Sequence, residues 1–250
     1  MFGGYPHYRW LQRQAGLVGI VPNAALRAVS RVGQRMTIGA RGRNHLIGTA
    51  GTLAHRVAHV NLYFDAGSRT RMLAPASISA RAEHIKEILC ADNNPSRAAS
   101  RVDFLTYLTD SVLVKTDRAS MASSLELRAP FLDVRVIEFA FGSVPERLKV
   151  GRRGTKLILR DLARRHLPLS VADKKKQGFS IPMDDWMRGS WGDYIRGVLA
   201  DVPPELFERK VITTLLNAQA EGYSNANRLY ALTMFELWRR AYDIEDFVQT

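Results

Sequence analysis

The sequence predicts a mainly α-helical protein. Apolar residues recur every three or four positions in several segments of the 250-residue chain, which is the spacing of a helix with one buried face. Glycine, proline and asparagine mark many ends of these segments, and neither an internal repeat nor a low-complexity linker is present. Few segments alternate apolar and polar residues as strands do, and Val60–Phe64 is the best strand candidate.

Polar capping residues place the first helices. Asn23 and Asp103 are expected to cap helices that run to Val32 and Leu113, because each side chain can accept hydrogen bonds from backbone amides of a first helical turn. Between them, apolar residues at helical spacing predict a helix over Pro75–Cys90.

Breaker residues separate these helices from their neighbours. Residues 39–54, rich in Gly, Arg and Thr, are expected to form a loop, and Asn93–Ser96 is expected to end the preceding helix. Val134–Phe141 predicts a short helix that Gly142 and Pro145 stop. The remaining helices are expected toward the C-terminus, at residues 154–167, 185–191, 194–199 and 228–242.

Composition excludes several classes of protein. No run of about 18 apolar residues occurs, and the first arginines flank no apolar core, so neither a membrane span nor a signal peptide is expected. The single cysteine, Cys90, excludes an intramolecular disulfide, fits a reducing cytoplasm and is expected to be a packing residue. The six histidines are scattered, so no metal site is expected.

The net charge of +12 is concentrated near the N-terminus. Residues 1–60 contain eight arginines and no acidic residue, and the first acid is Asp65. A basic arm can bind nucleic acid, but these arginines are spread among Leu, Val and Ala, and few aromatic rings are available for stacking on bases. Nucleic-acid binding is therefore a minor alternative, beside contact with acidic parts of a larger protein or with a polyphosphate substrate.

The segment Val114–Asp133 carries the strongest functional signal. Its charged residues are interspersed with Ala, Ser and Met, and they are Lys115, Asp117, Arg118, Glu126, Arg128 and Asp133. This pattern differs from that of a solvated helix face, so some of the charges are expected to turn inward, where a charge needs a partner. The segment is therefore either a structural ion-pair network or the wall of a polar site.

Four of these charges are candidate site residues. Asp117 and Arg118 are adjacent, so they cannot face each other on one helix, and each is expected to reach another partner. Glu126 and Arg128 share a face if the chain is extended there, which Ala129–Pro130 favours. Two interpretations stay open: the four residues form a buried brace, or some of them border a ligand pocket.

This segment resembles the C-terminal part of the synthetase domain of glutamine-hydrolysing asparagine synthetases. Three further segments are similar to that family in the same order: Phe2–Pro6 to its Phe-Gly-Gly-Tyr, Lys175–Pro182 to its Lys-x-Gly-Phe loop, and Phe235–Trp238 to its closing helix. The resemblance covers nearly all 250 residues. It implies a mainly α fold: the helical C-terminal portion of an α/β adenine-nucleotide (PP-loop ATP pyrophosphatase-like) synthetase domain, with most of the parallel sheet missing upstream.

Two motifs of that family do not occur in this sequence. The Ser-Gly-Gly-x-Asp-Ser loop, which cradles the ATP pyrophosphate, is absent, and Gly39–Arg43 is a weak imitation of it. The cysteine nucleophile of the N-terminal glutaminase domain has no counterpart in Cys90. We therefore expect residues 1–250 to be the C-terminal part of the asparagine synthetase domain, from a truncated gene, a split gene or a misplaced start codon, and to be inactive alone.

The resemblance also implies a reaction and roles for residues. In the family, ATP and aspartate form β-aspartyl-AMP, and ammonia from glutamine displaces AMP; Mg²⁺ enters with ATP as part of the substrate. Lys176 occupies the position of the lysine that contacts the ATP phosphates, whereas Lys174 and Lys175 are expected to face solvent. Some of the four candidate residues Asp117, Arg118, Glu126 and Arg128 would border the aspartate and ATP pocket, and the alternative of a structural brace stays open beside this.

Two function classes stay open. The first is an enzyme, the C-terminal fragment of an ATP-dependent amidotransferase of asparagine biosynthesis. Its expected partners are aspartate or a related carboxylate, ATP, and a separate upstream half or a second copy of the chain, with no membrane. The second is a non-catalytic remnant or binding module that kept the helical part. The gene sequence upstream of Met1 would discriminate between them, because the phosphate loop is expected there only for the enzyme.

Overall fold

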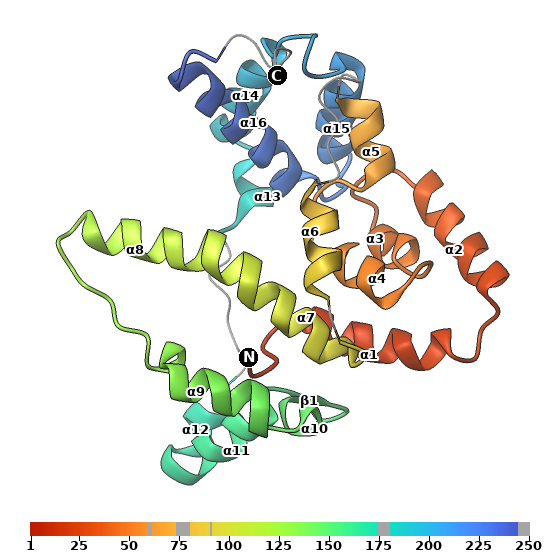
Figure 1. Ribbon diagram of the computed structural model, residues 1–250. Coiled ribbons are helices and arrows are strands. Elements are labelled where there is room, and N and C mark those ends of the chain that lie inside the picture. Colours follow the sequence, from red (N-terminus) through yellow and green to blue (C-terminus); the bar gives the residue numbers. More distant parts are fainter. Residues whose placement is uncertain (60–61, 74–80, 91, 175–180, 245–250) are drawn as a thin grey trace. The chain divides into compact units, whose positions relative to one another are not determined.

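The computed structural model confirms the mainly helical class (Figure 1). It describes residues 1–59, 62–73, 81–90, 92–174 and 181–244, with the backbone alone at residues 81–83. The chain divides into two compact units: unit 1 is Met1–Asn23, Gly51–Ala58 and Glu83–Gln177, and unit 2 is Ala24–Ala50, His59–Ala82 and Gly178–Thr250. None of the helices in these described ranges is long and apolar enough to span a membrane.

Unit 1 contains α1 (Pro6–Val18), which packs against α7 (Pro95–Asp103) and against a small hairpin. The hairpin pairs β1 (Val150–Gly151) with β2 (Gly154–Thr155) in antiparallel register, and within the described ranges it is the one sheet. α1 begins at Pro6. Proline is favoured at this position, because an amide hydrogen in the first turn of a helix would have no partner within the helix. The two helices bury the apolar side chains Tyr8, Leu11, Ala98, Ala99 and Val102.

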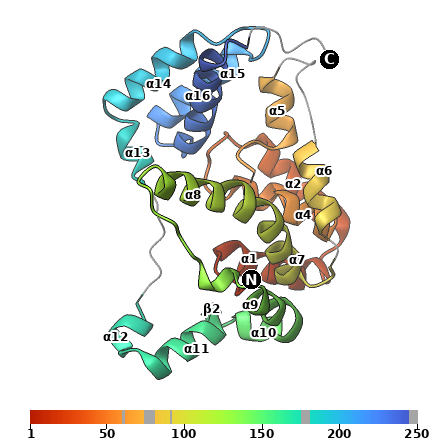
Figure 2. The same cartoon turned by 60° about the vertical axis from the view of Figure 1, so that its left-hand side comes forward.

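A long continuous helix follows in unit 1. α7 runs directly into η2 (Phe104–Leu113), which has π-helical hydrogen bonding, and then into α8 (Val114–Met121), as both views show (Figures 1 and 2). The helix begins after Asn94, whose side chain accepts hydrogen bonds from the backbone amides of Ser96 and Arg97. No side chain of η2 is buried, although its sequence is rich in Phe, Leu and Val.

The predicted cap at Asp103 is wrong, whereas the predicted break at Asn93–Ser96 is confirmed. Asp103 ends α7 inside the continuous helix, and its Oδ2 accepts a 2.7 Å hydrogen bond from the Tyr8 hydroxyl. His7 Nε2 lies 2.8 Å from the same oxygen. Because the carboxylate is occupied by partners about 95 residues away along the chain, no local pattern reveals its role.

Short elements complete unit 1. They are η3 (Pro130–Leu132), α9 (Val134–Glu138), η4 (Phe139–Ser143), α10 (Glu146–Lys149), α11 (Leu157–His166) and α12 (Leu169–Ala172), and α4 (Leu53–His59) and α6 (Arg81–Leu89) lie mainly in it. The helix expected at Val134–Phe141 is confirmed as α9 with η4. The helix expected from Gly154 begins only at Leu157, because Gly154 and Thr155 pair with β1. α6 confirms the described part of the helix expected over Pro75–Cys90; residues 74–80 lie outside the described ranges.

Unit 2 is built around an apolar cluster. Its helices are α2 (Asn23–Arg35), α3 (Arg43–Ile47), α5 (Ala66–Met72), α13 (Met183–Trp186), α14 (Ser190–Ala200), α15 (Arg209–Ala220) and α16 (Ala226–Ala241). α14, α15 and α16 pack on one another, and α15 also packs on α5. Ile195, Leu199, Leu215 and Leu229 are each at most 2% exposed in the cluster. Burying one such side chain contributes about 1.5–3 kcal/mol to stability.

Unit 2 corrects the sequence predictions in two places. Residues 39–54 are not a single loop, because α3 forms inside them after Gly42, whose positive φ of 85° turns the chain into the helix. Residues 62–64 form no strand, and Val60 and Asn61 lie outside the described ranges. The helix expected over residues 228–242 is confirmed as α16, and those over 185–191 and 194–199 appear as α13 and α14 with shifted ends.

Candidate active-site surface

Asp117 and Arg118 lie on α8 with their side chains exposed. Neither side chain forms a hydrogen bond or an ion pair with another residue in the described ranges. The expectation that such charges turn inward is therefore wrong for both. Because the fold of unit 1 makes no use of these two charges, they are free to meet a ligand or another protein surface.

A strained turn ends α8. Ser124 has a positive φ of 56°, which costs a non-glycine residue about 1–3 kcal/mol. The turn is closed by hydrogen bonds from Ser124 N to Met121 O at 2.9 Å and from Leu125 N to Ser120 O at 3.0 Å. These bonds fix the direction in which the chain leaves the helix, and they start an extended loop.

Glu126 and Arg128 form an ion pair in this loop. The distance from Arg128 Nη2 to Glu126 Oε1 is 2.5 Å, and the two side chains are 85% and 70% exposed. Ala129, next to the pair, is extended (φ −107°, ψ 98°), and the ion pair places the side chains of Glu126 and Arg128 on one face, as predicted. An exposed pair of this kind contributes about 0–1 kcal/mol, so the interpretation of the four charges as a buried brace is wrong.

Apolar side chains share this surface with the charges. Five of them are more than half exposed: Met121, Leu125, Leu127, Phe131 and Val134. We call residues 114–134 the exposed segment. Several exposed apolar side chains in one segment are typical of a ligand-binding or protein-binding surface. The exposed segment therefore combines uncommitted charges with apolar contact area.

The structure brings the N-terminal Phe-Gly-Gly-Tyr motif to the exposed segment. The Phe2 and Phe131 rings meet edge to face, with centroids 5.8 Å apart. Gly3 has a positive φ of 67°, and a Cβ added there would collide with Val150 Cγ2. Only glycine satisfies both constraints, which explains one glycine of the motif. Two segments that the sequence analysis singled out separately thus meet in unit 1.

The same motif leads into a buried polar cluster that the sequence analysis missed. Tyr5 stacks on His7 and meets the exposed Tyr107 edge to face. Burial and the nearby Asp103 carboxylate raise the pKa of Tyr8 well above its usual range, so Tyr8 is a neutral hydrogen-bond donor. The cluster anchors α1 on α7.

A second buried cluster surrounds Lys149, which is 1% exposed. Its Nζ lies 2.6 Å from Glu146 Oε1, and Ser96 Oγ donates a 2.7 Å hydrogen bond to Glu146 Oε2. Nζ also lies 5.6 Å from the centroid of the Phe141 ring. The spacing of Glu146 and Lys149 on α10 is the only local signal of this pair, and it equally fits two solvated side chains.

Lys176 lies outside the described ranges, as does Lys175. Lys174 is exposed, as expected. The contact of Lys176 with the ATP phosphates therefore stays a prediction.

The chain matches the family model described as asparagine synthase over residues 1–240. The chain belongs to the asparagine synthase family. It is 28% identical over 253 residues to a putative glutamine-hydrolysing asparagine synthetase of Mycobacterium tuberculosis, an alignment that covers 97% of this chain and 38% of that protein. It is 31% identical over 139 residues to the glutamine-hydrolysing asparagine synthetase 1 of Bacillus subtilis, covering 55% of this chain and 22% of that protein. No solved structure matches it.

Membership of the asparagine synthase family confirms the sequence-based resemblance. The family model includes both the Phe-Gly-Gly-Tyr motif and the exposed segment, which the structure joins through Phe2 and Phe131. The chain spans well under half the length of the curated asparagine synthetases that it matches.

Proposed function

We propose that this chain is the C-terminal part of a glutamine-hydrolysing asparagine synthetase, an ATP-dependent C–N ligase. In the proposed reaction, the aspartate side-chain carboxylate attacks the α-phosphorus of ATP, pyrophosphate leaves, and β-aspartyl-AMP forms. Ammonia derived from glutamine then attacks the activated carbonyl, AMP leaves, and asparagine forms. The observation that carries the proposal is the family match over residues 1–240.

The exposed segment supports this assignment. Asp117 and Arg118 are uncommitted, and the Glu126–Arg128 pair is exposed and contributes little to the fold. In our proposal, these four residues border the aspartate and ATP pocket, which the rest of the synthetase completes. An arginine there can hold a carboxylate or phosphate through paired hydrogen bonds. A carboxylate there can orient the ammonium group of aspartate or the incoming ammonia.

Lys176 is the proposed catalytic residue. MgATP enters as a substrate, and negative charge moves toward the bridging oxygen and the pyrophosphate as the α-phosphate is attacked. An ammonium group on a flexible side chain can follow this charge and stabilise it where it develops. Lys176 supplies such a group in a Lys-x-Gly-Phe sequence whose glycine permits close approach of the backbone to a ligand.

The test is formation of AMP and asparagine from aspartate, MgATP and ammonia. We expect none from the purified chain alone, because the Ser-Gly-Gly-x-Asp-Ser phosphate loop does not occur in its sequence. Positioning of the reactants can supply about 7–11 kcal/mol of barrier lowering, and that loop is part of it. Adding the upstream part of a synthetase is expected to restore both products. Continued absence of AMP in the mixture would favour a non-catalytic binding module.

A further inference from the structure

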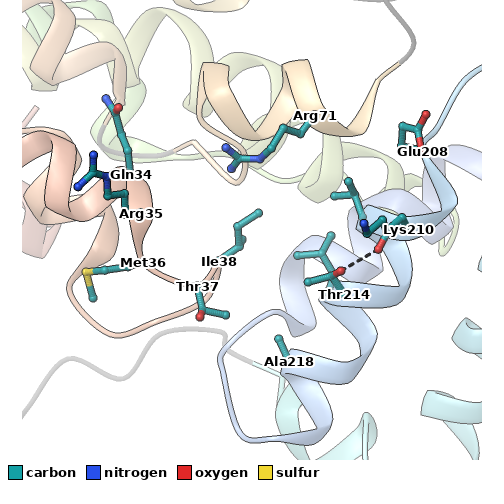
Figure 3. A pocket seen from close by; sticks show the side chains of 12 residues that line it. Gln34, Arg35, Met36, Thr37, Ile38, Arg71, Glu208, Lys210, Thr214 and Ala218 are labelled. Carbon is teal, nitrogen blue, oxygen red and sulfur yellow. Dashed lines mark hydrogen bonds between the residues drawn. The ribbon is translucent and has the colours of Figure 1, made fainter.

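Unit 2 contains a cavity that the proposed synthetase chemistry does not use. It has a volume of about 710 Å³. It lies between three parts of unit 2: α5, α15, and the end of α2 together with residues 36–38 (Figure 3). Arg71 reaches from α5 toward Ile38, and Thr214 and Ala218 project from α15 into the same space. The volume is within the range of about 300–1,000 Å³ that is typical of small-molecule sites.

The floor of the cavity is apolar and fixed. Leu215 belongs to the core of unit 2 at 1% exposed, and Ile38 and Val211 pack against that core. The Thr214 hydroxyl offers the cavity no free donor, because it donates a 2.8 Å hydrogen bond to the Lys210 carbonyl of its own helix. A rigid apolar floor favours an apolar ligand group, since hydrocarbon that enters it leaves water.

The rim of the cavity is cationic. Arg35, Arg71 and Lys210 line it together with one carboxylate, Glu208. None of the three cationic side chains has a hydrogen bond or ion pair with another residue in the described ranges. Arg43 of the same unit, by contrast, is paired with Asp65 at 2.7 Å. Three uncommitted cations against one carboxylate favour an anion at the rim.

We propose that this cavity binds a small amphipathic anion, a free medium-chain carboxylate. Its hydrocarbon tail covers Ile38, Val211 and Leu215, and its carboxylate accepts hydrogen bonds from Arg71 and Lys210. A nucleotide fits less well, because the floor offers few donors for a base or a ribose. An alkylammonium ion is disfavoured by the excess of positive charge. The inference is independent of the proposed synthetase reaction, because it uses no residue assigned to that reaction.

The first test is calorimetric titration of the full chain with octanoate below its micelle-forming concentration. We expect saturable binding at one site, about tenfold or more tighter than that of acetate or octylammonium, because the site requires both the tail and the negative charge. Binding of acetate as tight as that of octanoate would reduce the site to a general anion site and overturn the proposal. Equal binding of octylammonium, or no saturable binding of octanoate, would also overturn it.

Variants locate the site. Arg71→Gln and Lys210→Gln are each expected to weaken octanoate binding about tenfold, by removing a charge-assisted hydrogen bond. Arg209→Gln is the matched control, because Arg209 is the neighbour of Lys210 on α15 and does not line the cavity; it is expected to bind normally. If Arg209→Gln weakens binding as much as Lys210→Gln does, octanoate responds only to the overall positive charge of the chain, and the assigned site is wrong.

A filling variant tests the tail. Thr214→Phe places a ring in the cavity from an exposed position, and it is expected to abolish octanoate binding while the circular dichroism spectrum and the melting temperature stay as in the parent. Thr213→Phe, at the adjacent exposed position outside the cavity, is the control. Undiminished octanoate binding by folded Thr214→Phe would overturn the proposed location.

Discussion

Two ion pairs of almost the same length differ in what surrounds them. Arg43 and Asp65 of unit 2 are 2.7 Å apart, with side chains 2% and 7% exposed, and Ser68 Oγ donates a further hydrogen bond to Asp65 Oδ2. Glu126 and Arg128 of the exposed segment are 2.5 Å apart and almost fully in solvent. Distance alone therefore does not indicate the role of a pair. The buried pair belongs to the fold, and the exposed pair is available for binding.

The pKa of Asp65 reflects this environment. Burial alone would raise it, but the hydrogen bonds from Ser68 and the Arg43 guanidinium outweigh burial and lower it to about 2. Glu236 on α16 follows the same rule: it is fully buried, and hydrogen bonds from Arg239 and Arg240 lower its pKa despite burial.

The largest effect on stability is expected from breaking the buried pair. Arg43→Met leaves the Asp65 carboxylate buried without its cation, and it should lower the free energy of unfolding by about 3–5 kcal/mol. Urea denaturation followed by circular dichroism measures the difference. Arg128→Met in the exposed segment is the control and should cost no more than about 1 kcal/mol. Equal losses in the two variants would remove the distinction between the pairs.

At Lys176, a change of similar size is expected in the activation free energy of the reaction rather than in the free energy of unfolding. In a synthetase completed with its upstream part, Lys176→Ala should lower kcat about a hundred- to thousandfold, or about 3–4 kcal/mol, with aspartate binding largely kept. Lys174→Ala serves as the control, because Lys174 is exposed. If both variants have the same mild effect, the lysines are a solvated basic face. If Lys176→Ala raises only the KM for ATP, the lysine binds the ground state and the transition state equally.

Acid should destabilise the fold through the buried pair, because protonation removes the charge of the Asp65 carboxylate. The folded-state pKa of Asp65 is about 2, below the unfolded value of about 3.9, so its stabilisation is present above about pH 4 and is lost as the pH falls through 2. The linked loss is about 2 kcal/mol. Unfolding free energies measured between pH 5 and pH 2 should fall less steeply in Asp65→Asn than in the parent chain. An unchanged slope would show that Asp65 does not contribute to acid unfolding.

The smallest effect on stability is expected at the exposed charges. Asp117→Asn and Arg118→Gln should change the free energy of unfolding by no more than about 0.5 kcal/mol, because neither side chain has a partner in the described ranges. In the completed synthetase, each should nevertheless lower kcat/KM for aspartate or ATP by at least about tenfold. Lys115→Gln, on the same helix, is the control for general charge. Normal activity in both variants would show that these charges do not border the pocket.

Local patterns predicted some parts of this structure and not others. α16 was recognised because apolar residues recur at helical spacing along its whole length. α15 was not expected, although Ile212, Leu215 and Ala218 form its buried face, because its short apolar run lies among threonines and amides. The prediction of a loop over residues 39–54 was wrong for a different reason. Its helix begins at Arg43, whose partner Asp65 is 22 residues away in sequence.

The charged segment shows the same limit at the candidate site. The pairing of Glu126 with Arg128 in an extended loop was predicted from their spacing and the nearby proline. The direction in which the charges face did not follow, because that depends on which other segments cover α8. The buried charges of Lys149 and Asp103 were missed for the complementary reason: Ser96, Tyr8 and His7 come from distant parts of the chain.

The π-helical stretch η2 sets the rotation of α8 about the axis of the long helix. Each residue of an α-helix advances the side-chain direction by about 100°, so deleting one residue between Phe104 and Leu113 would turn every later side chain by that angle relative to α7. Asp117 and Arg118 would then point away from their present side while α1 and α7 stayed packed. The number of residues in η2 therefore determines the direction in which Asp117 and Arg118 point. An insertion or deletion in η2 would change that direction, whereas a substitution of one side chain would not.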